Sequence, residues 1–151
     1  MLLKILYLTI SLFVTTYSFS QTDYKLCDDQ KKYPYYNPVL KYKGGFWAIK
    51  NHFKSHIFDN EFDTLKNNSG IITIQFTVNC HGIPGNYVSK TCDLEYQKYE
   101  INQIILNKIL NLTKELQDWI PAKNENNEYV NSHTFLTFRF ENGILTNILP
   151  K

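Results

Sequence analysis

Two segments of the chain alternate between apolar and polar residues. Between residues 72 and 79, isoleucine, phenylalanine and valine occupy every second position, and the same alternation recurs over 134–140. A period of two is typical of a β-strand with one buried and one solvated face. Each segment is followed by a turn signal, over 82–85 and at Asn142 and Gly143, and then by a shorter predicted strand, 86–91 and 144–149. The sequence therefore predicts two β-hairpins.

Two other segments place apolar residues three or four positions apart, which indicates amphipathic helices. The first covers about 46–58; the second follows Asp93, a candidate N-cap, and ends before Pro121. The apolar face of the second helix consists of Ile101, Ile104, Ile105, Leu112, Leu116 and Trp119. The order α-β-β-α-β-β predicts an α+β two-layer sandwich, an antiparallel sheet with two helices on one face.

The first 20 residues have the pattern of a secretory signal peptide. Lys4 precedes an apolar run over 5–14, and Ser18 and Ser20 occupy the small-residue positions of a cleavage site before Gln21. The alternative is an uncleaved anchor, although the run is shorter than the ~20 residues that a membrane span needs. We predict an exported chain, periplasmic or secreted, without a stable membrane span after cleavage. Its parts are a signal peptide over 1–20, an extended tyrosine-rich lead-in over 21–42 and a domain over 43–149.

Export makes disulfides possible, and three cysteines allow one internal bridge. If the first hairpin turns at 83–84, Cys80 and Cys92 lie about 17 Å apart along the ladder, at about 3.3 Å per residue. Bridged Cα atoms lie about 4.4–6.8 Å apart. A wider loop centred on Asn86 would bring this pair together. Otherwise the bridge recruits Cys27, and we predict Cys27–Cys80.

Composition excludes several classes of protein. The chain has 151 residues, enough for one domain, and 43% of them are hydrophobic, too many for a disordered chain. Sixteen basic and 14 acidic residues give a net charge of +2. That balance does not supply the basic surface of a nucleic-acid-binding protein.

Histidine pairs are the main candidates for chemistry. His52 and His56 lie four positions apart on the first predicted helix, a spacing that lets two imidazoles share a metal ion. No glutamate lies between them and the sequence places no third ligand nearby, since His81 and His133 are distant. We therefore expect surface residues, with no metal or cofactor. The alternative is an exported metal-binding protein or hydrolase that uses His52 and His56.

Other catalytic arrangements are weaker. Cys80 and His81 are adjacent in a predicted strand, so their side chains point to opposite faces. The sequence contains neither a G-x-S-x-G nucleophile elbow nor a phosphate-binding loop. We predict a protein that is not an enzyme.

Several motifs, taken in order, resemble the C-terminal domain of TonB-type proteins. They are Gly44-Gly45 before the first helix, residues 70–78 followed by His81-Gly82, the segment 119–122 (Trp-Ile-Pro-Ala) and the segment 137–140 (Thr-Phe-Arg-Phe). The resemblance covers about residues 43–149. It implies a periplasmic, non-enzymatic module that binds a protein or peptide of the cell envelope partly by adding a strand to a sheet edge. We expect neither the retained anchor nor the long proline-rich spacer of an energy transducer.

Two predicted strands could supply such an edge, 86–91 and 144–149, and the sequence does not decide which is free. We take the last strand as the candidate interaction edge. Its apolar residues are Ile144, Leu145, Ile148 and Leu149. The lead-in also carries tyrosines, which either recognise a partner or pack on the domain. These are Tyr33, Tyr35, Tyr36 and Tyr42.

Overall fold

A computed structural model describes residues 24–28, 32–34, 39–57, 62 and 68–150. The predicted signal peptide over 1–20 lies outside the described residues, as do Tyr35 and Tyr36. Among the residues described, no helix is both long enough and apolar enough to cross a membrane.

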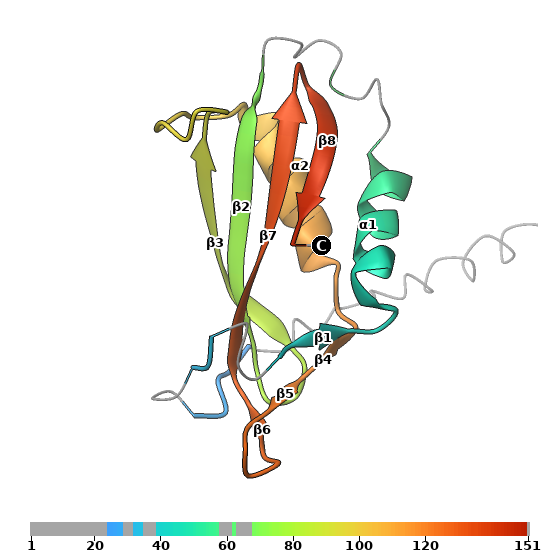
Figure 1. The fold of residues 1–151 in the computed structure, drawn as a ribbon, viewed down its shortest axis with the longest axis vertical. Coiled ribbons are helices and arrows are strands. Elements are labelled where there is room, and N and C mark those ends of the chain that lie inside the picture. The colour runs from blue at the N-terminus through green and yellow to red at the C-terminus, as the bar shows by residue number, and fades with distance from the viewer. Residues whose placement is uncertain (1–23, 29–31, 35–38, 58–61, 63–67, 151) are drawn as a thin grey trace, which may run out of the picture.

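The centre of the fold is a four-stranded antiparallel sheet in the order β3-β2-β7-β8 (Figure 1). Its strands are β2 (Gly70–Val78), β3 (Pro84–Cys92), β7 (Ser132–Glu141) and β8 (Ile144–Leu149). Both predicted hairpins are confirmed, and antiparallel pairing of β2 with β7 joins them. Asn142 and Gly143 connect β7 to β8 with φ values of 52° and 78°. Positive φ at both positions is what a tight two-residue hairpin turn requires.

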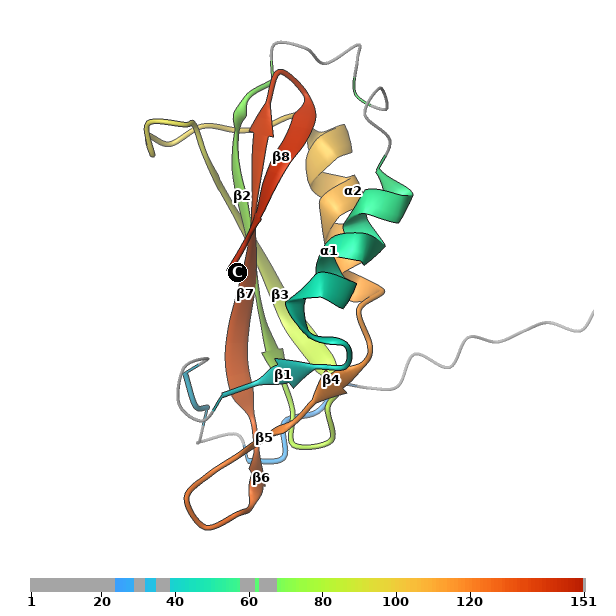
Figure 2. The same ribbon diagram turned by 45° about the vertical axis from the view of Figure 1, so that its right-hand side comes forward.

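Two helices, α1 (Gly45–His56) and α2 (Gln103–Lys114), cover one face of the sheet (Figure 2). The predicted α+β two-layer sandwich is therefore confirmed. Four short strands form two additional ribbons that the sequence did not predict. They pair β1 (Lys41–Tyr42) with β4 (Trp119–Ile120), and β5 (Ala122–Lys123) with β6 (Tyr129–Val130).

The core lies between the sheet and the two helices. The Phe53 ring of α1 packs on Phe138 of β7 with ring centroids 4.7 Å apart, and both side chains are fully buried. From α2, Ile105 and Ile109 are also fully buried. Alternate residues of β2 point into this layer, which explains the period of two in its sequence.

The second helix is shorter than predicted, and Asp93 does not cap it. Asn102 is the N-cap, and its side chain accepts a hydrogen bond from the Ile104 N–H at 2.8 Å. The Asp93 carboxylate instead accepts the N–H groups of Glu95 and Gln97, at 3.0 and 2.7 Å, and so closes a separate turn. Both arrangements satisfy local N–H groups, which is why an aspartate alone did not distinguish them.

Candidate functional site

The N-terminal segment over 24–28 is bonded to the β2–β3 turn. Cys27 and Cys80 form a disulfide with Cα atoms 6.0 Å apart, which confirms the predicted pairing. The Asn79 N–H donates to the Ile83 carbonyl at 2.9 Å, so the turn is tight. Cys92 is a free, half-buried thiol at the opposite end of β3, across from Ile71. The predicted turn position at 83–84 is wrong, because Val78 pairs with Pro84 and Cys80 lies in the turn itself. The observed register still separates Cys92 from Cys80, as predicted.

Two buried asparagines hold the same segment through their side-chain amides. The Asn79 amide donates to the Lys25 carbonyl at 2.9 Å. The Asn131 side chain accepts the Cys27 N–H at 3.1 Å and donates to the Asp28 carbonyl at 2.8 Å. Both asparagines are at most 2% exposed. Because buried polar groups are costly without partners, these bonds make residues 24–28 an integral part of the domain.

Tyrosines fill the space between this segment and the sheet. A Cβ added to Gly85 would lie 2.2 Å from the Tyr24 ring, so only glycine allows that ring to lie on β3. The Tyr87 ring stacks on Phe76 with centroids 5.3 Å apart. Burial, with a smaller contribution from the neighbouring Tyr24, raises the pKa of Tyr87 to about 12. Burial also raises the pKa of Tyr24.

Two tyrosines of the lead-in, Tyr33 and Tyr42, contact the domain in different ways. Tyr33 forms a parallel bridge with Ser132, in which the His133 N–H donates to the Tyr33 carbonyl at 2.8 Å. Tyr42 lies in β1 and contacts the Trp119 ring edge-on at 4.9 Å. Of the two interpretations of these tyrosines, packing on the domain is the one that the Tyr42 side chain follows.

The two predicted edge strands, β3 and β8, are both outermost in the described sheet. In β8, Ile148 is buried in the core and Leu145 packs against it, whereas Ile144 and Leu149 are exposed. The register between β7 and β8 shifts near Phe140, which marks a β-bulge. The Asn147 side chain accepts the Ile148 N–H at 2.9 Å, and Pro150 follows the strand. Bulges, local side-chain bonds and proline all limit pairing at an edge.

The β3 edge is open over residues 86–90. Its register with β2 also shifts, between Gln75 and Thr77, and beyond Lys90 the edge is covered, because Cys92 forms an antiparallel bridge with Lys98. Asn86, Val88, Ser89 and Lys90 are exposed, Val88 by 52%. Val88 and Lys90 pair with Gln75 and Thr73 of β2. The His133 N–H donates to Tyr33 rather than to Thr77, its partner in β2, so that pair is not hydrogen-bonded. Because hydrogen-bonded and non-bonded pairs alternate along a ladder, Gln75 also turns its N–H and C=O away from β7 and toward β3. The backbone groups of Val88 and Lys90 therefore face β2. Since backbone direction alternates along a strand, the N–H and C=O of Ser89 face away from the sheet.

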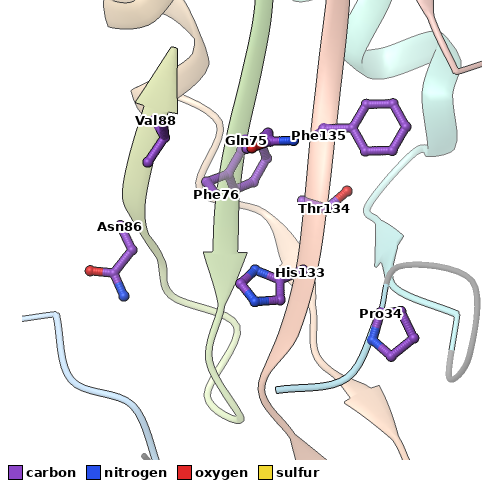
Figure 3. Close-up of a pocket in the computed structure, with 8 residues that line it drawn as sticks. All are labelled: Pro34, Gln75, Phe76, Asn86, Val88, His133, Thr134 and Phe135. Atoms are coloured by element: carbon purple, nitrogen blue, oxygen red, sulfur yellow. The ribbon is translucent and has the colours of Figure 1, made fainter. Parts of the chain in front are cut away.

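A hollow of about 480 Å³ adjoins this edge (Figure 3). Gln75, Val88 and Phe135 alternate along their strands with core residues, so they belong to the face of the sheet that the helices leave open. The hollow is lined by Pro34, Gln75, Phe76, Asn86, Val88, His133, Thr134 and Phe135. At its floor, His133 Nδ1 lies 3.0 Å from the Thr77 hydroxyl. A mostly apolar lining with a few polar groups suits an apolar or aromatic side chain.

The predicted histidine pair lies in the helix layer and gains a partner from α2. His52 Nε2 lies 3.0 Å from the Leu112 carbonyl and 3.5 Å from a carboxylate oxygen of Glu115. The His52 and His56 ring centroids are 4.7 Å apart. Sequence reasoning missed Glu115, because nothing in a local pattern connects it with α1. The third histidine, His81, is exposed beside the disulfide.

No family model matches the chain, and no curated protein or solved structure matches it either.

Proposed function

We propose that this chain is an exported, non-enzymatic module that binds a protein or peptide of the cell envelope by strand addition at the β3 edge. The observation that carries the proposal is an exposed outer strand with a hollow directly beside it. Strand addition obtains affinity from main-chain hydrogen bonds and specificity from pockets that take alternate side chains. At β3, the outward backbone groups of Ser89 would supply the hydrogen bonds, and the adjoining hollow would take a side chain.

An extended peptide would pair with the outward N–H and C=O of Ser89. Its alternate side chains would then lie over the open face of the sheet, where Val88 and Gln75 border the hollow. A ligand with an apolar or aromatic residue at that position fits the lining best. The strand itself has no proline beyond Pro84 to interrupt pairing.

The β8 edge is the second candidate. Ile144 and Leu149 are exposed there and supply apolar surface. A register shift does not distinguish the two edges, because both ladders contain one. However, the Asn147 side chain and Pro150 leave a short interval for a partner strand. These features favour β3 over the last strand for the binding role.

Export is supported by the sequence of the first 20 residues and by the Cys27–Cys80 disulfide, because disulfides persist in oxidising compartments. A binding role without catalysis is supported by the lack of a catalytic motif in the sequence and by the resemblance to the TonB C-terminal domain. That resemblance rests on the ordered motifs over 43–149.

A peptide selection tests the proposal. Purified protein beginning at Gln21 is used to select binders from a displayed library of random peptides, and amide hydrogen exchange locates them. We expect selected peptides to slow exchange at Ser89. Ser89→Pro, which removes the outward N–H, and Val88→Lys should each weaken binding at least tenfold.

The matched control is Ile144→Lys on the other outer strand, which should leave affinity unchanged. Thermal unfolding verifies that each variant is folded. Protection confined to β8, or undiminished binding by a folded Ser89→Pro variant, would overturn the assignment of the binding edge. Failure to select any peptide would count against the binding function itself.

A further inference from the structure

We propose that His52, His56 and Glu115 form a binding site for a divalent transition-metal ion of the zinc class. One ligand atom from each of the three residues lies within 4.8 Å of the other two. The two histidines come from successive turns of α1, and Glu115 is the C-cap residue of α2. The ion would therefore join the ends of two helices.

The ligand types match this class of ion. Imidazole nitrogen and carboxylate oxygen are ligands of Zn²⁺, at about 2.0–2.2 Å, and three protein ligands leave a fourth position for water. Two ligand atoms bound to one ion at about 2.1 Å lie at most about 4.2 Å apart. Ligand atoms that are up to 4.8 Å from one another must therefore move closer together when the ion binds. The Glu115 side chain is 54% exposed and His56 is exposed, so both can rotate without disturbing the core.

His56 is already oriented for such a role. Its Nδ1 lies 2.7 Å from the His52 carbonyl, one helical turn earlier, and 3.0 Å from the Ser55 hydroxyl. A hydrogen bond from Nδ1 to the carbonyl assigns the proton to that nitrogen and leaves Nε2 as a lone-pair donor. Metal-ligating histidines are commonly fixed through the second ring nitrogen in this way.

Without metal, His52 makes a contact with α2 that a bound ion would have to replace. Its Nε2 lies 3.0 Å from the Leu112 carbonyl, one of the last carbonyls of α2, which lack partners within the helix. A proton shared with Leu112 and the neighbouring Glu115 satisfies this helix end. Metal binding at Nε2 requires the ring proton to move to Nδ1 and the contact with the Leu112 carbonyl to break. The site lies in the helix layer, and it does not depend on strand addition at β3.

Calorimetry with Zn²⁺ and absorption spectroscopy with Co²⁺ test the site on untagged protein. We expect one ion per chain and visible Co²⁺ bands in the range of four-coordinate complexes. His56→Ala and Glu115→Gln should each lower Zn²⁺ affinity at least tenfold. His81→Ala, which removes another exposed histidine, should leave it unchanged.

Thermal unfolding in chelator provides the folding control, because both ligand variants alter exposed side chains and should unfold with the wild type. Zn²⁺ should raise the unfolding temperature of the wild type and His81→Ala, but not that of the ligand variants. The proposal is wrong if the wild type binds no stoichiometric ion, or if binding persists in both His56→Ala and Glu115→Gln.

Discussion

Asn131 accepts a hydrogen bond from the backbone N–H of Cys27 at 3.1 Å, across 104 positions of sequence. The same side chain donates to the Asp28 carbonyl, so a single buried amide fixes two consecutive backbone groups. The N-terminal segment is therefore held beside β7 by more than its disulfide.

Asn131→Ala should destabilise the folded protein by about 1–3 kcal/mol, because the Cys27 N–H and the Asp28 carbonyl lose this partner. Urea unfolding of the oxidised protein measures the change. The control is Asn126→Ala, an exposed loop asparagine, which should shift stability by less than about 0.5 kcal/mol. An equal effect of both variants would contradict the role assigned to Asn131.

Removal of the disulfide should be costly. Cys27→Ser with Cys80→Ser is expected to lower the free energy of unfolding by about 2–4 kcal/mol, since the bridge restricts the unfolded chain over a separation of 53 residues. Cys92→Ser, which removes the free thiol, should have a much smaller effect. Peptide mass mapping without reductant should recover the Cys27–Cys80 peptide. Recovery of Cys92 in the bridge would refute the pairing.

Because the Tyr87 phenol is buried, we expect the free energy of unfolding to decrease at alkaline pH. Its pKa is raised to about 12 in the folded state by burial, against about 10 in an unfolded chain. Its contribution is therefore complete below pH 10 and is lost as pH rises toward 12, because the unfolded state releases the proton first. Unfolding measured at pH 8 to 11.5 should show a steeper decline for the wild type than for Tyr87→Phe. Parallel curves would contradict this assignment.

Gly85→Ala should displace the Tyr24 ring, which the new Cβ would approach to 2.2 Å. We expect faster hydrogen exchange over 24–28 and a loss of stability. Because the clash requires both partners, the same substitution should be nearly neutral in a Tyr24→Ala background. A double-mutant cycle with additive effects would show that the ring does not rest on Gly85.

Local sequence patterns predicted those parts of the fold that a single strand, helix or turn decides by itself. The alternation around Ile74 and the turn at Asn142 and Gly143 identified the two hairpins before the structure was known. The long helix was wrong at both ends, since Asp93 caps a turn and Trp119 lies in β4, paired with Tyr42 of β1. The pairing between Trp119 and Tyr42 is long-range, so periodicity alone does not reveal it.

The candidate sites likewise contain features that local sequence predicts and features that depend on long-range packing. The hairpin pattern, a local quantity, argued against Cys80–Cys92 and so recruited Cys27, but it did not decide between Cys80 and Cys92 as the partner of Cys27. Glu115 lies beside His52 only because α1 and α2 end near each other, and that arrangement is decided by packing against the sheet. The openness of the β3 edge likewise depends on strand order, which the sequence left undecided.

The unequal edges of the sheet limit how many molecules can join one complex. The Asn147 side chain and Pro150 restrict β8, so a strand added at β3 would leave a poorer edge on the other side of the sheet. Open-ended assembly through strand pairing requires a donor edge and an acceptor edge on every copy. If the proposed strand addition at β3 is correct, we therefore expect complexes of fixed stoichiometry rather than filaments.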